Sequence, residues 1–294
     1  MRGLVLLSLC VAASASPGRE CRPLPPSAEL GLEGSSAAFR FSQSEESDDM
    51  AVKSLGDEVS ADRALEEDWR AAEAHWRRQK REVPPGLREE HVVAMTVYTG
   101  RGILSRSLND AVHSYGTDTV IYNACFPLKS VHYLLSVALD VLRDKPRGPP
   151  VYRGVENVTQ GKEGAVMRFG IFASTSRQRW VAQGFGAGTL FTVRTAYGSS
   201  IQNFSYDEYQ EEVLIPPYEQ FTIAGRSRAG GVHGYTLESG GFNGVEVGLR
   251  RDGDGRLIVY RKTAWWVWLL VALSGLAILG GIAFLVCKCC PGRC

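Results

Sequence analysis

The sequence has no excess of charge of either sign, since 33 lysine and arginine residues are balanced by 32 aspartate and glutamate residues. Nucleic-acid-binding domains typically carry a clear basic excess, so we expect no nucleic-acid partner. The chain also lacks a Gly-x-x-x-x-Gly-Lys phosphate loop and a Gly-x-Ser-x-Gly nucleophile motif. No two histidines stand at metal-ligand spacing, and we therefore expect no metal site. What the chain does have is 44% hydrophobic residues, enough for a packed globular core.

Both ends of the chain carry apolar segments, for which we expect different roles. Residues 1–16 are typical of a signal peptide, because Arg2 precedes a short apolar run and a small-residue cleavage site. Residues 264–286 are a charge-free stretch of 23 residues, about 34 Å as a helix, long enough to cross the hydrocarbon core. We therefore expect a single-pass type I protein at the cell surface, anchored by a C-terminal transmembrane helix, with a cytoplasmic Cys-rich tail over 287–294.

The cysteines divide between the two sides of the expected membrane. Juxtamembrane cysteines are typical S-palmitoylation sites, which predicts lipidation of Cys287, Cys289 and Cys290; unmodified thiols are the alternative. In the expected extracellular part, Cys21 and Cys125 remain. The spacing alone leaves open whether these two form a disulfide.

Helical and strand patterns follow one another along the chain. Residues 17–58 are rich in proline, serine and acidic residues, so we expect a flexible N-terminal segment. Helical spacing of apolar residues then predicts three helical regions, over 60–83, 88–113 with a break near Gly100, and 126–142. After Pro150 the period changes to two, which predicts strands at 151–155, 166–175, 189–196, 200–206, 212–217, 220–225, 232–237, 245–250 and 257–260. This order favours one α+β domain over 59–261.

Two sequons are typical of an exported chain. Asn157-Val158-Thr159 and Asn203-Phe204-Ser205 predict N-glycosylation at Asn157 and Asn203. The second sequon falls within the expected strand 200–206. A glycan there would lie close to the acidic stretch that follows.

Residues 209–217 place a polar, acidic segment directly before a short apolar run that two prolines end. The run suits a buried strand and is too short for a helix. Because side chains alternate along an extended chain, Gln210 and Glu212 are expected to face the same side and Glu211 the other. This arrangement is typical of an active-site edge, but charged residues also flank hydrophobic strands simply to keep them soluble.

Two shorter features precede it in the strand-rich half. Arg153 stands beside Gly154 at the end of an expected strand, and an arginine beside a glycine suits phosphate binding, because the guanidinium forms paired hydrogen bonds and glycine permits close approach. Ser174 opens a hydroxyl cluster at another strand end. Each feature by itself is equally typical of an ordinary surface strand or a polar turn.

The order and spacing of these motifs resemble the vertebrate ecto-mono-ADP-ribosyltransferases, the arginine-specific group with an Arg–Ser–Glu triad. The resemblance spans about Ser60 to Tyr260. It implies an ADP-ribosyltransferase-like fold, with a helical N-terminal part and a mixed β core around an NAD cleft. The segments that carry it are Val97-Tyr98-Thr99-Gly100, Val151-Tyr152-Arg153-Gly154, Arg168-Phe169-Gly170, Ser174-Thr175-Ser176, Val181-Ala182-Gln183, Phe204-Ser205 and Glu212-Val213-Leu214-Ile215-Pro216.

The resemblance also implies roles for individual residues. Arg153 would hold the NAD pyrophosphate, Ser174 would position the ribose and the key carboxylate, and Glu212 would be catalytic. Tyr98 and Ser205 match NAD contacts of the family. NAD would be the co-substrate, and ADP-ribose would pass to a protein arginine or to water with release of nicotinamide.

The chain departs from the family pattern at Gln210. Arginine-specific relatives have a glutamate there, two residues before the catalytic glutamate, where it orients the acceptor. Glutamine cannot form the charged pair with a guanidinium. The alternatives to an arginine-specific transferase are therefore an NAD glycohydrolase and, from another class, a non-catalytic cell-surface binding ectodomain. The family resemblance also suggests a lipid anchor, whereas residues 264–286 predict a transmembrane helix.

Overall fold

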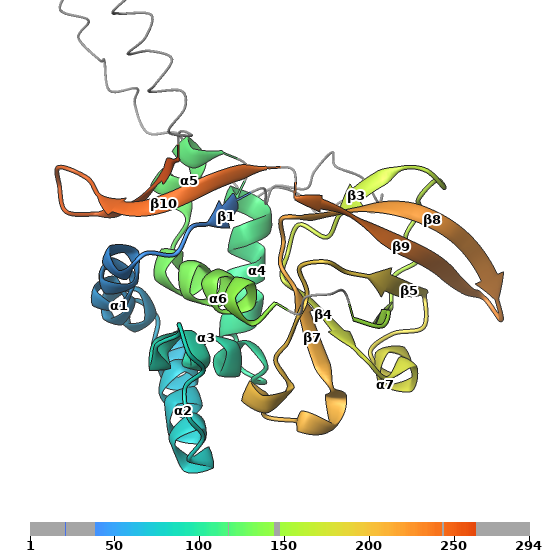
Figure 1. Cartoon of the computed structure of the whole chain (residues 1–294), viewed down its shortest axis with the longest axis horizontal. Coiled ribbons are helices and arrows are strands. Elements are labelled where there is room, and N and C mark those ends of the chain that lie inside the picture. The colour runs from blue at the N-terminus through green and yellow to red at the C-terminus, as the bar shows by residue number, and fades with distance from the viewer. Residues whose placement is uncertain (1–20, 22–38, 117, 144–147, 243, 263–294) are drawn as a thin grey trace, which may run out of the picture.

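The computed structural model describes residues 21, 39–116, 118–143, 148–242 and 244–262. A helical half from the first part of the chain packs beside a strand-rich half from the second part (Figure 1). This arrangement confirms the expected α+β class. The signal peptide (1–16), the transmembrane helix (264–286) and the tail with Cys287, Cys289 and Cys290 lie outside the described residues. Among the described helices, none is long and apolar enough to cross a membrane.

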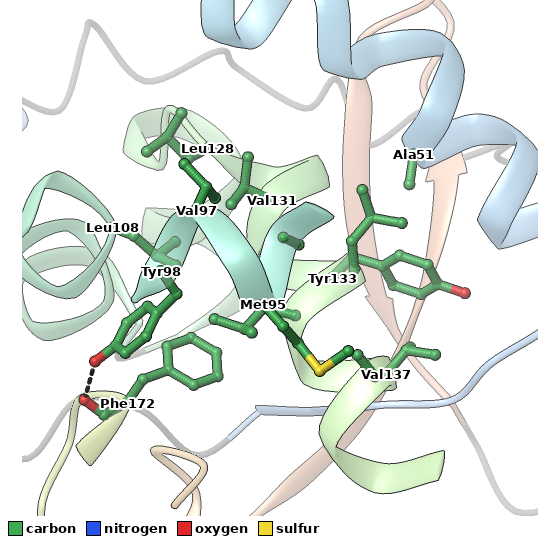
Figure 2. Packing of buried hydrophobic residues seen from close by; sticks show 14 of the residues in the cluster. Ala51, Met95, Val97, Tyr98, Leu108, Leu128, Val131, Tyr133, Val137 and Phe172 are labelled. Atoms are coloured by element: carbon green, nitrogen blue, oxygen red, sulfur yellow. Dashed lines mark hydrogen bonds between the residues drawn. The ribbon is translucent and has the colours of Figure 1, made fainter. Parts of the chain in front are cut away.

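Helices α3 and α6 form the centre of the helical half. Every residue of α3 from His91 to Tyr98 is buried, as are ten of the fourteen residues of α6. Such helices are apolar nearly all round because neighbours cover them on most sides. Figure 2 shows Met95 and Tyr98 of α3 beside Val131 and Tyr133 of α6. The helices are α1 (Glu45–Ser60), α2 (Arg63–Gln79), α3 (Glu89–Tyr98), α4 (Leu104–Tyr115), α5 (Thr119–Cys125), α6 (Lys129–Leu142) and α7 (Arg179–Gly184).

The expectation of a flexible segment over 17–58 is wrong for its second half. Residues 39–41 form strand β1, and α1 begins at Glu45. The Ser44 side chain accepts a hydrogen bond from the Ser47 amide at 3.1 Å, and acidic residues fill the first turn. Both features stabilise a helix N-terminus. The acidic run is therefore a helix start, and Ala51, Leu55 and Val59 supply the buried face.

Most strands of the second half belong to one mixed sheet of eight, in the order β3-β8-β9-β5-β2-β4-β7-β6. Within it β5 and β9 run parallel, and the other neighbours are antiparallel. A second sheet has the order β1-β10-β11. The strands are β1 (Phe39–Phe41), β2 (Val151–Val155), β3 (Val166–Arg168), β4 (Ala173–Ser176), β5 (Thr189–Arg194), β6 (Ser199–Ser200), β7 (Glu212–Ile215), β8 (Glu219–Ala229), β9 (Val232–Phe242), β10 (Val245–Arg251) and β11 (Leu257–Arg261).

Two of the expected strands differ in the structure. The single strand expected over 166–175 is divided into β3 and β4, with Gly170 between them at a φ of 68° that extended backbone does not adopt. The strand expected over 200–206 is wrong: only the two residues of β6 pair, and a 3₁₀ helix, η1 (Gln202–Phe204), follows. Asn203 therefore lies in a short helix and not in a strand.

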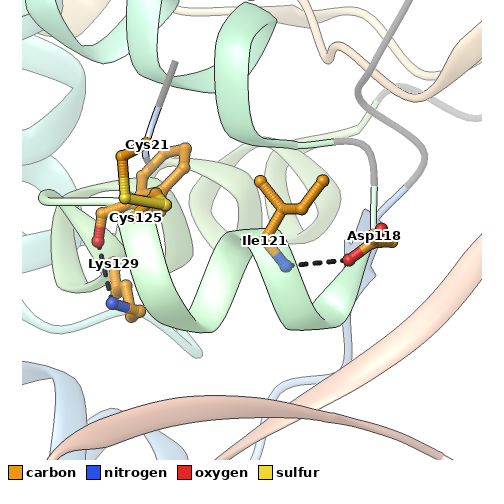
Figure 3. Close-up of a disulfide and its surroundings, with 6 residues drawn as sticks. Cys21, Asp118, Ile121, Cys125 and Lys129 are labelled. Carbon is orange, nitrogen blue, oxygen red and sulfur yellow. Dashed lines mark hydrogen bonds between the residues drawn. A yellow bond between two sulfur atoms is a disulfide. The ribbon is translucent and has the colours of Figure 1, made fainter. Parts of the chain in front are cut away.

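Cys21 and Cys125 form a disulfide, which settles the open question about this pair. The bond joins the N-terminal part of the chain to the last residue of α5 (Figure 3). Asp118 caps that helix, since its side chain accepts a hydrogen bond from the Ile121 amide at 2.8 Å. The residue at position 21 is thereby fixed to the folded domain.

Candidate active site

A cavity of about 1040 Å³ lies between the two halves. The helical half contributes Asp68 of α2 and the segment from Val97 to Gly102, and the strand-rich half contributes β2, β4 and the start of β7. Its size is at the upper end for small-molecule sites and suits a dinucleotide. Five residues expected to bind NAD, to act in catalysis or to orient the acceptor line it: Tyr98, Arg153, Ser174, Gln210 and Glu212.

Three adjacent strands carry the expected triad. β4 lies between β2 and β7, so Arg153, Ser174 and Glu212 come from neighbouring strands. Glu212 is paired in register with Ser176, and Ser174 is paired with Leu214. Ser174 and Glu212 are therefore diagonal neighbours on one face of the sheet. The Ser174 side chain favours the ionised form of the Glu212 carboxyl group and so lowers its pKa.

The Arg153 side chain contacts the backbone of β4. Its guanidinium donates a hydrogen bond to the Ser174 carbonyl at 2.8 Å and lies 5.8 Å from the centre of the Phe169 ring. Among the residues that the structure describes, this carbonyl is the one hydrogen-bond acceptor for Arg153. A guanidinium has five N–H donors, so most of them are available to an anion in the cavity.

Gly154 has a packing role that the sequence did not indicate. A Cβ atom there would lie 2.0 Å from the Ala182 carbonyl oxygen of α7 and 2.6 Å from that of Gly186. Both distances are shorter than any van der Waals contact. Glycine at 154 therefore permits α7 to pack against β2, and the same residue lines the cavity.

Tyr98 ties the helical half to the strand that carries Ser174. Its hydroxyl donates a hydrogen bond to the Phe172 carbonyl at 2.6 Å, drawn as a dashed line in Figure 2. The Asn109 side chain donates to the Tyr98 oxygen at 3.0 Å and accepts from the Phe172 amide at 2.9 Å. Asn109 was not singled out in the sequence, because a lone asparagine on a helix gives no signal of such a role.

The electrostatics of the site follow from burial. Glu212 is 6% exposed, and burial raises the pKa of its carboxyl group, while the Ser174 side chain and the Arg153 charge oppose this rise. Burial likewise lowers the pKa of Arg153 and raises the pKa of Tyr98 to about 12. Tyr98 thus stays protonated near neutral pH and remains a donor.

The segment before Glu212 is not extended, so the alternation argument for Gln210 is wrong. Residues Glu208–Gln210 form a 3₁₀ helix, η2, and Glu211 adopts a left-handed conformation with φ 44° and ψ 49°. The Ser176 hydroxyl fixes this turn by donating to the Gln210 carbonyl at 2.6 Å. Gln210 nevertheless lines the cavity, whereas the Glu211 side chain accepts a hydrogen bond from Gln178 at 2.8 Å.

Of the remaining predicted residues, Asn157 lines the cavity, and Ser205 and Asn203 do not. Ser205 is 2% exposed and does not line the cavity; its hydroxyl accepts a hydrogen bond from the Asp207 amide at 3.1 Å. Asn157 and Asn203 are both exposed, as a glycan acceptor must be, and Asn157 lines the cavity.

Asp207 also lines the cavity, although the sequence offered no reason to select this residue. In the described ranges no cluster of three or more potential metal ligands occurs.

The sequence is similar to a family of ADP-ribosyltransferases. The family model described as NAD:arginine ADP-ribosyltransferase matches residues 41–243. Ecto-ADP-ribosyltransferase 5 of Bos taurus is 38% identical over 265 residues, covering 81% of this chain and 83% of its own length. GPI-linked NAD(P)(+)--arginine ADP-ribosyltransferase 1 of Mus musculus is 36% identical over 184 residues, covering 58% of this chain and 57% of its own.

The fold matches a solved structure of the same kind. The crystal structure of the eukaryotic mono-ADP-ribosyltransferase ART2.2 superposes with a TM-score of 0.62 at 26% identity, covering 80% of this chain and 96% of that one. Mutants of ART2.2 have been solved in complex with NADH and with NAD. The expected ADP-ribosyltransferase-like fold is thereby confirmed.

Proposed function

Because the chain belongs to the NAD:arginine ADP-ribosyltransferase family, we propose that it transfers ADP-ribose from NAD to protein arginine and releases nicotinamide. The observation that carries this proposal is the position of Glu212, a buried carboxyl group that lines one cavity together with Ser174 of the paired strand and Arg153. No metal is required, because nicotinamide leaves as a stable neutral molecule.

Glu212 acts on the ribose in this proposal. When the bond between ribose C1′ and the nicotinamide nitrogen breaks, nicotinamide keeps the electron pair and the ribose becomes an oxocarbenium-like cation. A carboxylate facing that cation stabilises the transition state more than the substrate, whose ribose is still neutral. A guanidine nitrogen of the acceptor then bonds to C1′ and releases a proton.

The neighbouring residues bind and orient. The free N–H donors of Arg153 bind the pyrophosphate of NAD. Ser174 holds Glu212 toward the ribose, and Tyr98 fixes the start of β4 through Phe172. Ser205 supports the turn before Glu212 from a buried position, so we assign it no direct contact with NAD.

Nicotinamide release tests this proposal. We expect the natural protein to release nicotinamide from NAD and to label agmatine, a small guanidine acceptor. Glu212→Gln should reduce release roughly 100- to 1000-fold, the usual effect of losing one group that stabilises the transition state. Glu211→Gln is the matched control, because it removes the same charge one residue away and its side chain contacts Gln178. Equal release by the natural protein and Glu212→Gln would overturn the proposal and favour a non-catalytic binding ectodomain.

NAD glycohydrolase activity is the second candidate function, and Gln210 is the observation that favours it. An amide cannot form a charged pair with the acceptor guanidinium. Nicotinamide release that is insensitive to agmatine, without labelling of agmatine, would identify the protein as a glycohydrolase.

We further propose a cell-surface location with the cavity outside the cell. A relative is GPI-linked by its name, whereas residues 264–286 favour a transmembrane helix here. Treatment of expressing cells with a phosphatidylinositol-specific phospholipase distinguishes the two anchors. A transmembrane protein stays on the cells, and release into the medium would contradict this topology.

A further inference from the structure

A second carboxylate lines the cavity on the turn that leads to Glu212. Asp207 precedes η2 and is exposed, and it lines the same cavity as Gln210 and Glu212. The role proposed for Glu212 makes no use of Asp207. Asp207 lies beside Gln210, the position at which this chain departs from the family pattern. It is therefore a candidate for the residue that determines which acceptor binds.

Asp207 and Gln210 form one polar unit. One carboxylate oxygen of Asp207 accepts a hydrogen bond from the Tyr209 amide at 3.2 Å, and the other accepts from the Gln210 side-chain nitrogen at 3.1 Å. A carboxylate only accepts hydrogen bonds, so the amide orientation of Gln210 is determined. The Gln210 side-chain nitrogen points to Asp207, and its side-chain oxygen remains an acceptor.

This unit has unused acceptor capacity. An ionised carboxylate has about four lone-pair sites, and the two bonds above occupy two of them. The Gln210 side-chain oxygen adds another acceptor nearby. Two oxygen acceptors from neighbouring side chains, with one negative charge between them, can receive the parallel N–H donors of a guanidinium.

The other carboxylates of the turn are engaged elsewhere. Glu208 accepts a hydrogen bond from Arg81 at 2.7 Å, and Glu211 accepts one from Gln178 at 2.8 Å. Neither Glu208 nor Glu211 lines the cavity. On this turn, Asp207 is therefore the carboxylate that faces the cavity ahead of Glu212.

We propose that Asp207 binds the guanidinium of the acceptor arginine, with the Gln210 side-chain oxygen as the second acceptor. Asp207 thus supplies the negative charge that relatives place at position 210. This inference rests on the proposed function and adds to it a specificity residue that differs from the family pattern. Acceptor binding and NAD cleavage then depend on different residues, which can be tested separately.

The first experiment compares two reactions of the purified full-length protein. Asp207→Asn keeps an oxygen that can accept from the Tyr209 amide, removes the charge and replaces the oxygen that accepts from Gln210 with an N–H donor. We expect the KM for agmatine to rise roughly 10- to 100-fold, the range for losing a charge-assisted hydrogen bond, while nicotinamide release without agmatine stays within about twofold. Glu211→Gln, the matched control, should change neither. An unchanged KM in Asp207→Asn, or a rise in Glu211→Gln instead, would overturn the proposal.

A rescue experiment separates charge from turn structure. The double variant Asp207→Asn/Gln210→Glu moves the carboxylate by three residues to the usual family position. We expect it to recover agmatine transfer to within about threefold of the natural protein, a range smaller than that of one charge-assisted hydrogen bond. If Asp207 only stabilised the turn, a charge at 210 would not restore transfer, and a double variant as impaired as Asp207→Asn would contradict the proposal.

A binding measurement separates this inference from the proposed function. Agmatine is titrated calorimetrically into Glu212→Gln with saturating NAD, with and without Asp207→Asn. We expect the second substitution to weaken agmatine binding roughly 10- to 100-fold. This result does not depend on turnover, so it holds even if the natural protein fails to release nicotinamide. Equal agmatine affinity in both variants would overturn the role of Asp207 whatever the activity.

Discussion

Ser174 and Glu212 lie on neighbouring strands and on the same face of the sheet, two residues apart in register. The Ser174 side chain favours the ionised carboxylate, whereas burial raises the pKa of this group. Ser174 therefore influences both where the carboxylate points and at which pH it is charged.

Ser174→Ala tests the second of these effects. Nicotinamide release requires ionised Glu212, so the rate rises with pH as this group loses its proton. Loss of the Ser174 hydroxyl raises the Glu212 pKa further, and the acidic limb of the pH–rate profile should move to higher pH than in the natural protein. Thr175→Val, which alters the adjacent hydroxyl bonded to the Val213 carbonyl, should leave the position of this limb unchanged.

Glu212→Gln is expected to stabilise the fold while it reduces nicotinamide release. A carboxyl group whose pKa is raised by folding contributes stability below its unfolded pKa and loses that stability as the pH rises through the folded pKa. At neutral pH the ionised group is therefore a net cost, which glutamine removes. Thermal unfolding without NAD should give a higher Tm for the variant at pH 7.5. The difference should shrink near pH 4, and a lower Tm at pH 7.5 would contradict the argument.

Gly154→Ala should destabilise the domain by about 1–3 kcal/mol, as overpacking of a close contact does. The added methyl group would overlap the Ala182 carbonyl oxygen and separate α7 from β2. Gly184→Ala is the matched control, since a Cβ atom at 184 meets nothing within 4 Å. Urea unfolding measures both variants. Equal midpoints for Gly154→Ala and the natural protein would show that the contact relaxes freely.

Removal of the disulfide should lower stability by about 2–5 kcal/mol, because the bond closes a long loop in the unfolded chain. The two cysteines are 104 residues apart. Cys21→Ser/Cys125→Ser, measured by urea unfolding, should show this loss without a change in nicotinamide release at low temperature. The natural protein under reducing conditions should match the double variant.

A glycan at Asn157 should affect large acceptors more than small ones, because this residue lines the cavity. Asn157→Gln in protein from mammalian cells is expected to increase labelling of protein acceptors severalfold and to leave agmatine labelling unchanged. Asn203→Gln serves as the comparison, since Asn203 is exposed and does not line the cavity. Mass measurement of each variant establishes whether the sequon carries a glycan.

The candidate site residues could be selected from the sequence because the order and spacing of short motifs resemble the family. Each motif alone carried little information, and the structure brings Arg153, Ser174 and Glu212 to one cavity. The pairing of Cys21 with Cys125 was not predictable, because spacing does not determine which cysteines meet.

Features that depend on local backbone geometry were missed. The start of α1 was hidden because an acidic run is typical both of flexible segments and of a helix N-terminus. The turn before Glu212 was missed because Glu211, a non-glycine residue, adopts a left-handed conformation that its sequence does not signal. Asp207 went unrecognised for the same reason, since its partner Gln210 was expected in a strand.

The left-handed residue Glu211 also separates two parts of the chain that can change independently. Before it lies a turn held by Arg81, Gln178 and Ser176, and after it lies β7, whose buried residues fix Glu212. Mutations in the turn can accumulate during evolution without displacing the strand. One inherited site for cleaving NAD can in this way acquire new acceptors, and the turn is a compact segment for directed evolution of acceptor choice.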